Sequence, residues 1–73
     1  MEGLTAKETE IAELIAEGHS IKEVAFRLVL SPAYVSWRLH RIYVVLGLHS
    51  ARELAHWVFQ RRQPATSEWQ RAA

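Results

Sequence analysis

The chain has 73 residues and a net charge of +1, and 49% of its residues are hydrophobic. This length fits one domain with a small core, because a chain of this size buries only roughly 60% of its unfolded surface. It has no cysteine, which excludes disulfides and thiolate metal sites. No apolar run approaches the ~20 residues of a membrane span, and Met1-Glu2-Gly3 has no signal-peptide character. We therefore expect a cytoplasmic protein with no membrane contact.

The charges divide along the chain. Residues 1–23 carry six glutamates and two lysines, whereas residues 24–73 carry seven arginines and two glutamates. A basic half can follow a phosphate backbone while the acidic half faces away. Two differently charged solvated faces would explain the same division.

The first predicted helix covers residues 6–17. Thr5 and Glu8 fit the Ser/Thr-x-x-Glu capping box at its start. Its apolar stripe includes Ile11, and Gly18 can end it in a left-handed conformation.

The second predicted helix covers residues 21–28 and begins at another capping box, Ser20 to Glu23. Free backbone N–H groups at a helix start favour phosphate. We therefore predict that Ser20 and Lys22 contact DNA phosphates, although capping alone also accounts for Ser20.

The third predicted helix covers residues 32–46, with Ser31 as its cap and Pro32 at its first position. Only Val29 and Leu30 separate it from the second helix before that cap. A connection this short forces a sharp angle between the helices, as in a helix-turn-helix. The third helix is the longest and is the predicted recognition helix.

The fourth predicted helix covers residues 51–62 after the capping box Ser50 to Glu53. Trp57 and Phe59 add two aromatic side chains beyond its own apolar stripe. They predict a homodimer interface, although Trp57 packed against the first helix is an alternative. Residues 63–73 contain Pro64, and we expect a flexible C-terminal tail there. The expected fold is an all-α four-helix bundle containing a helix-turn-helix, with its domain at residues 1–62.

Several stretches of this sequence are similar to the LuxR-type (GerE-type) DNA-binding domain. They run in unbroken register over residues 4–59 and comprise Leu4-Thr5, Glu8, Glu10-Ile11, Leu14-Ile15-Ala16-Glu17-Gly18, Ser20, Lys22-Glu23-Val24-Ala25, Arg27-Leu28, Ser31, Val35, Ile42, Leu46-Gly47, Ser50 and Glu53-Leu54. The resemblance implies a four-helix fold whose third helix enters the major groove and whose fourth helix forms a dimer contact. The resemblance also implies that such domains usually end a longer regulator, after a receiver or ligand-binding domain. This sequence covers only the DNA-binding part, so we expect a stand-alone domain.

The chain departs from the family pattern in the third helix. The family's usual lysine is Ser36, its usual histidine is Arg38, and its two basic residues before leucine-glycine are Val44 and Val45. Three cations that would touch DNA are therefore replaced.

On a helical wheel, the face opposite the core of the third helix presents Trp37, His40 and Arg41, with Tyr34 and Arg38 on one flank and Ser36 on the other. The resemblance implies that Ser36, Trp37 and His40 read bases. Arg38 and Arg41 are predicted to reach guanine or phosphate oxygens, and Tyr34 is predicted to contact phosphate or to fill a gap in the core. A solvated face is the alternative, and Trp37 also suits protein contact. We expect Arg41→Ala to leave stability nearly unchanged.

The four histidines have no metal-ligand spacing, and no nucleophile lies beside a base. We expect no metal, no cofactor and no enzymatic activity. The favoured function is a sequence-specific transcription regulator that binds double-stranded DNA as a homodimer. The alternative is an adaptor or anti-activator that contacts another regulator or RNA polymerase, favoured by Trp37, Val44 and Val45.

Overall fold

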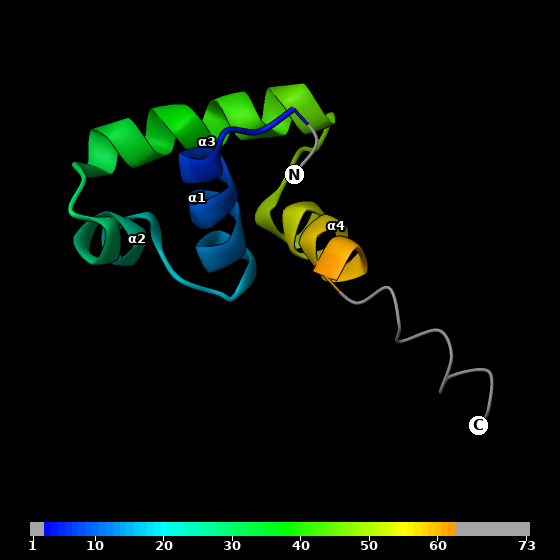
Figure 1. Cartoon of the computed structure of the whole chain (residues 1–73), viewed down its shortest axis with the longest axis horizontal. Helices are drawn as coiled ribbons and strands as arrows, with labels where there is room; N and C mark the ends of the chain where they lie inside the picture. The colour runs from blue at the N-terminus through cyan, green and yellow to red at the C-terminus, as the bar shows by residue number, and fades with distance from the viewer. Residues whose placement is uncertain (1–2, 63–73) are drawn as a thin grey trace.

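Four helices make up residues 3–62, the part of the chain that the computed structural model describes (Figure 1). They are α1 (Ala6–Ala16), α2 (Ile21–Leu28), α3 (Pro32–Leu46) and α4 (Ala51–Arg62). The all-α prediction is confirmed. α1 ends one residue earlier than predicted, because Glu17 is its C-cap with φ −80° and ψ −2°. The tail predicted at 63–73 lies outside the described residues.

Reciprocal hydrogen bonds begin the first two helices, as predicted. The Thr5 hydroxyl accepts from the Glu8 backbone N–H, and the Glu8 carboxylate accepts from the Thr5 N–H, both at 3.1 Å. Ser20 and Glu23 repeat this pair at 3.1 and 2.8 Å. Each box satisfies two backbone donors that the helix leaves open.

The other two helix starts are capped by one serine each. Ser31 caps α3, and Pro32 occupies its first turn. The Ser50 hydroxyl accepts from the Glu53 N–H at 3.2 Å, but the Glu53 carboxylate accepts from the N–H of His49 and not of Ser50. The third predicted capping box is therefore only half formed.

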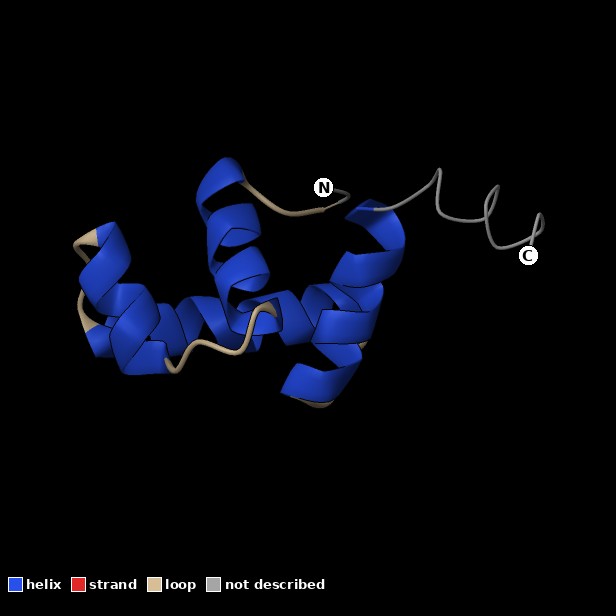
Figure 2. Ribbon diagram, turned by 90° about the horizontal axis from the view of Figure 1, so that it is seen from below, coloured by secondary structure: helices blue, strands red, loops and turns tan. Residues whose placement is uncertain are grey.

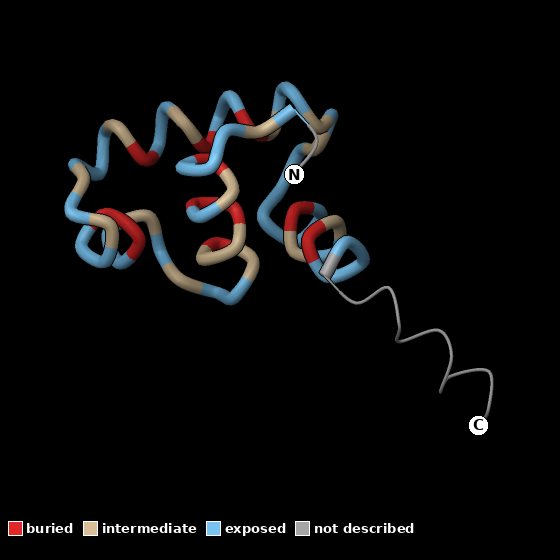
Figure 3. The backbone as a smooth tube through the Cα atoms, viewed as in Figure 1, coloured by how far each residue is buried: buried red, intermediate tan, exposed pale blue. Residues whose placement is uncertain are grey.

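The core forms around α1, which extends from the middle of α3 between α2 and α4 (Figures 1 and 2) and packs against all three. The buried faces of the helices point toward α1 (Figure 3). Each helix buries one face. No helix within residues 3–62 is long and apolar enough to cross a membrane. The buried hydrophobic residues are Ile11, Ala12, Ile15, Val24, Ala25, Val35, Leu39, Ile42, Leu54 and Val58.

A left-handed residue makes the turn between α2 and α3. Val29 has φ 58° and ψ 50°, and the following Leu30 N–H donates to the Ala25 carbonyl at 2.8 Å. The chain then reaches the Ser31 cap of α3 at once. This connection confirms the predicted helix-turn-helix geometry.

Val29→Gly is expected to stabilise the domain by about 0.5–1 kcal/mol. A β-branched residue is strained at positive φ, by roughly 1–2 kcal/mol, and the 89% exposed Val29 side chain contributes little burial. The greater entropy of unfolded glycine offsets part of the gain. Thermal unfolding should show a melting temperature a few degrees higher than that of wild type. Val29→Ala is the matched control and should gain less; a glycine variant no more stable than wild type would contradict the strain argument.

Candidate nucleic-acid interface

One face of α3 is open to solvent along its whole length. At 100° per residue, this face lies opposite the stripe that enters the core. The 15-residue helix is about 22 Å long, which suits insertion into a major groove about 12 Å wide. The residues of the open face are Ala33, Trp37, His40, Arg41 and Val44, all exposed.

The two arginines of α3 converge on one buried carboxylate of α1. The Arg38 Nη1 donates to Glu8 Oε2 at 2.9 Å, and the Arg41 Nη1 lies 2.9 Å from both Glu8 oxygens. Glu8 is completely buried, and it is the only buried charged residue of the described chain. With the Thr5 N–H added, its oxygens are fully engaged. Glu8 therefore joins the start of α1 to the middle of α3.

This environment keeps the Glu8 carboxylate ionised. Burial raises the pKa of Glu8, but the hydrogen bonds from Thr5 and Arg38 and the charges of both arginines together outweigh it. The net result is a pKa below the ordinary value of 4.5. The negative charge that the two arginines need is consequently present at neutral pH.

The Glu8 contacts change what the sequence predicted for the two arginines. The side chain of Arg38 is 26% exposed, whereas that of Arg41 is 44% exposed. The hydrogen bonds described for Arg41 use Nη1 alone, so Nε and Nη2 remain for other acceptors. The contact changes the expected effect of Arg41→Ala on stability: the substitution removes one of two cations from a buried carboxylate, so we now expect it to lower stability.

Arg38 also lies between two aromatic rings. Its Cζ is 5.2 Å from the ring centroids of both Tyr34 and Trp37, and its Nε donates to the Tyr34 hydroxyl at 2.9 Å. The Tyr34 hydroxyl and Glu8 together raise the pKa of Arg38. Tyr34 is half-buried against Arg38, while Trp37 remains 61% exposed. The arrangement fixes the guanidinium and restrains the exposed indole.

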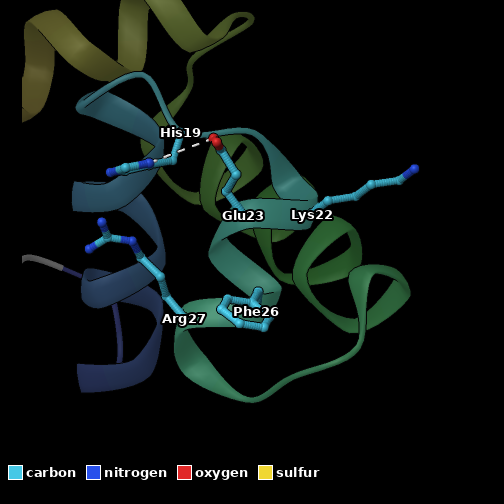
Figure 4. A pocket seen from close by; sticks show the side chains of 5 residues that line it. All are labelled: His19, Lys22, Glu23, Phe26 and Arg27. Carbon is cyan, nitrogen blue, oxygen red and sulfur yellow. Dashed lines mark ion pairs between the residues drawn. The ribbon is translucent and has the colours of Figure 1, made fainter.

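The start of α2 presents one cation to solvent. Lys22 extends away from the domain, while Glu23 turns toward His19 (Figure 4), whose Nδ1 lies 3.6 Å from the Glu23 carboxylate. The hydrogen bond from the Ser20 N–H lowers the pKa of Glu23, so this carboxylate also stays ionised. Lys22 is therefore available to an external anion, and the Ser20 hydroxyl accepts the capping hydrogen bond from the Glu23 N–H.

The positions where family cations are absent differ from one another. Ser36 and Val44 are exposed. Val45 lies beside the N-terminal segment, since a Cβ added to Gly3 would come within 2.9 Å of its Cγ1. A long basic side chain is thus replaced by a small apolar contact at Val45, while Val44 stays 67% exposed.

The two aromatic residues of α4 lie on different sides of the helix. Residues two apart are separated by about 160° around the axis. Trp57 is half-buried and packs against the core, and the Arg61 guanidinium lies 4.8 Å from its ring centroid. Phe59 is 55% exposed. One flat dimer interface cannot contain both rings.

Glu8 is the residue of this region that sequence analysis missed. It was assigned only to the capping box, and nothing in the local pattern indicates that it is buried. The available signal is the pair of arginines, Arg38 and Arg41, three residues apart on the third predicted helix. Within residues 3–62 no three acidic or histidine side chains are grouped so that they could hold a metal ion.

A short α2, a tight turn and a long α3 with an open face define a helix-turn-helix DNA-binding domain. Residues 2–58 match the family described as "Bacterial regulatory proteins, luxR family". A candidate HTH-type transcriptional regulator of Mycobacterium tuberculosis strain H37Rv is 37% identical over 62 residues, which are 85% of this chain and 7% of that protein. The transcriptional regulatory protein UhpA of Salmonella typhimurium is 39% identical over 56 residues, or 77% and 29% of the two chains. No solved structure matches.

The chain belongs to the LuxR family of bacterial regulatory proteins, and it has the fold of the DNA-binding domain of an HTH-type transcriptional regulator. The resemblance stated from the sequence is confirmed. The family is non-enzymatic, in agreement with the sequence prediction. The chain spans less than a third of the length of these relatives.

Proposed function

We propose that this domain recognises specific DNA sites by inserting α3 into the major groove and laying the start of α2 against the phosphate backbone. The observation that supports this docking is the open face of α3, which runs the length of the longest helix and lies opposite its buried stripe. DNA binding also implies that the protein works in the bacterial cytoplasm.

The cations have different roles in this proposal. Arg41 keeps free donors at the edge of the open face, so it contacts a phosphate or guanine. Lys22 contacts phosphate beside the first N–H groups of α2. Arg38 is held by Glu8 and Tyr34 and acts by positioning Trp37. Ser36 and His40 are exposed beside them and complete the predicted base-reading set.

Lys22→Ala tests the phosphate contact. It should weaken binding to all duplexes alike and reduce the slope of log K against log salt by roughly 0.9, the value for one phosphate contact. The slope is measured by fluorescence anisotropy with a specific and a random duplex. Lys7→Ala, an exposed lysine of α1 paired with Glu10, removes the same charge elsewhere and should change the slope less. A loss confined to the specific duplex would contradict a phosphate role.

We also propose that the domain pairs on DNA through the exposed side of α4. Phe59 supports this, because an aromatic ring more than half exposed on a short helix is suited to burial by a partner. An isologous pair would place two α3 helices about 34 Å apart, one turn of DNA.

Phe59→Ala should leave folding intact and abolish the cooperative binding of two protomers to a palindromic duplex, so that the second protomer binds only at a higher concentration than in wild type. Sedimentation velocity with a half-site and a full-site duplex measures the stoichiometry. The half-site complex serves as the control and should be unaffected. One wild-type protomer on the full site at saturation would contradict pairing.

A protein-binding function is the second candidate. It is supported by two exposed apolar side chains, Phe26 on α2 and Val29 in the turn that follows it, which are 86% and 89% exposed. An adaptor would bind duplex DNA only weakly and would not show the steep salt dependence that several phosphate contacts produce. The slope measured above therefore separates the two functions.

A further inference from the structure

The open face of α3 is mainly apolar. Trp37 and Val44 are 61% and 67% exposed and Ala33 adds a methyl group, while the exposed side chains of His40 and Arg41 lie at the two edges of the face. The cations of α3 lie toward its flank, where Glu8 engages both. Removing exposed apolar surface from water is favourable, so this face is suited to an apolar ligand.

A major groove offers one apolar group to such a face. Each base pair presents hydrogen-bonding groups there, and thymine alone of the four bases adds a C5-methyl group. Trp37 and Val44 are seven residues apart, so they lie about 10 Å apart along the helix axis. The two side chains can therefore meet methyl groups at different base pairs.

The Trp37 indole is restrained before any ligand arrives. The Arg38 guanidinium lies 5.2 Å from its ring centroid and is itself tied to Tyr34 and Glu8 at 2.9 Å. A restrained side chain loses less rotamer freedom on binding. An indole held in this way can take one defined position against a base edge more readily than a freely rotating ring can.

We infer that Trp37, with Val44, makes this domain selective for thymine by burying the C5-methyl group in the major groove. The inference rests on the proposed docking of α3. It assigns specificity at those base pairs to methyl contact, with the arginines supplying affinity at the flank.

The test replaces thymine by deoxyuridine, which lacks only the methyl group. A high-affinity duplex is first selected from a random pool with the wild-type chain, and each thymine is then replaced singly. At one or more positions wild type should lose about fourfold in affinity, the equivalent of about 0.8 kcal/mol for one methyl-sized group. Trp37→Ala or Val44→Ala should bind the thymine and deoxyuridine duplexes equally at the position that each residue reads.

Phe26→Ala is the matched control, because it removes an exposed aromatic ring from α2 and should keep the thymine preference of wild type. Circular dichroism checks that every variant folds. A wild type that binds both duplexes equally at every position, with salt-dependent binding retained, would overturn the inference and leave the docking intact. A thymine preference that survives both α3 substitutions would overturn it as well. Absence of any duplex binding would overturn the proposed function and this inference together.

Discussion

Glu8→Ala is expected to lower the free energy of unfolding by about 3–5 kcal/mol, the usual cost of removing one partner from a buried ion pair. The substitution leaves Arg38 and Arg41 without the carboxylate that engages them. It also removes the acceptor of the Thr5 N–H at the start of α1. Such a loss is a large share of the stability of a domain this small, so urea unfolding should show a much lower midpoint or no folded baseline.

Glu10→Ala is the matched control on the same helix, because Glu10 makes only an exposed pair with Lys7. Its effect should stay below about 1 kcal/mol. Glu8→Gln keeps an acceptor for the Thr5 N–H, so its loss of unfolding free energy should lie between those of Glu8→Ala and Glu10→Ala. Equal stability of the Glu8 and Glu10 variants would contradict a structural role for the buried carboxylate.

The stability of the wild type should also fall in acid. The folded pKa of Glu8 lies below its ordinary value of 4.5, so its contribution is present well above that value and disappears as the pH falls through the folded pKa. Melting curves between pH 7 and pH 3 measure this. Glu8→Gln should flatten the profile without abolishing it, because the pKa of Glu23 is lowered too.

Arg41→Ala is expected to weaken DNA binding by about 1–3 kcal/mol and to lower the melting temperature as well. The affinity falls because the Nε and Nη2 donors of Arg41 are lost from the edge of the open face. The melting temperature falls because Glu8 loses one of its two cations. Anisotropy well below the melting temperature, together with thermal unfolding, separates the two effects.

Arg52→Ala controls for net charge, since Arg52 is an exposed arginine of α4. It should change affinity only slightly and stability hardly at all. Equal affinity losses in the Arg41 and Arg52 variants would mean that the loss reflects overall charge, which would contradict a contact at α3.

The local signals in this sequence were strong enough to predict the helices. Caps at Thr5, Ser20, Ser31 and Ser50 act within four residues of the chain, so their hydrogen bonds follow from spacing alone. The only errors at helix ends were the early end of α1 and the partner of Glu53, which depend on details of backbone geometry.

The partners of the charged side chains could not be predicted in the same way. Glu8 meets Arg38 and Arg41 across about thirty residues of sequence, and that contact depends on how α1 packs on α3. Similarly, Trp57 and Phe59 look equivalent in the sequence, but the packing of α4 on α1 half-buries the first and exposes the second. The open face of α3 was predicted, because helical periodicity fixes which residues lie opposite a buried stripe.

The central claim is that α3 and the start of α2 form the DNA-binding surface. Titration of the ¹⁵N-labelled chain with a selected duplex, followed by two-dimensional NMR, tests it most directly. The account predicts the largest shifts at the indole N–H of Trp37 and at the backbone amides of Lys22, Ser36, His40 and Arg41, with the Trp57 indole changing less. Shifts concentrated on α1, or no shifts at low salt with a duplex selected by this chain, would contradict it.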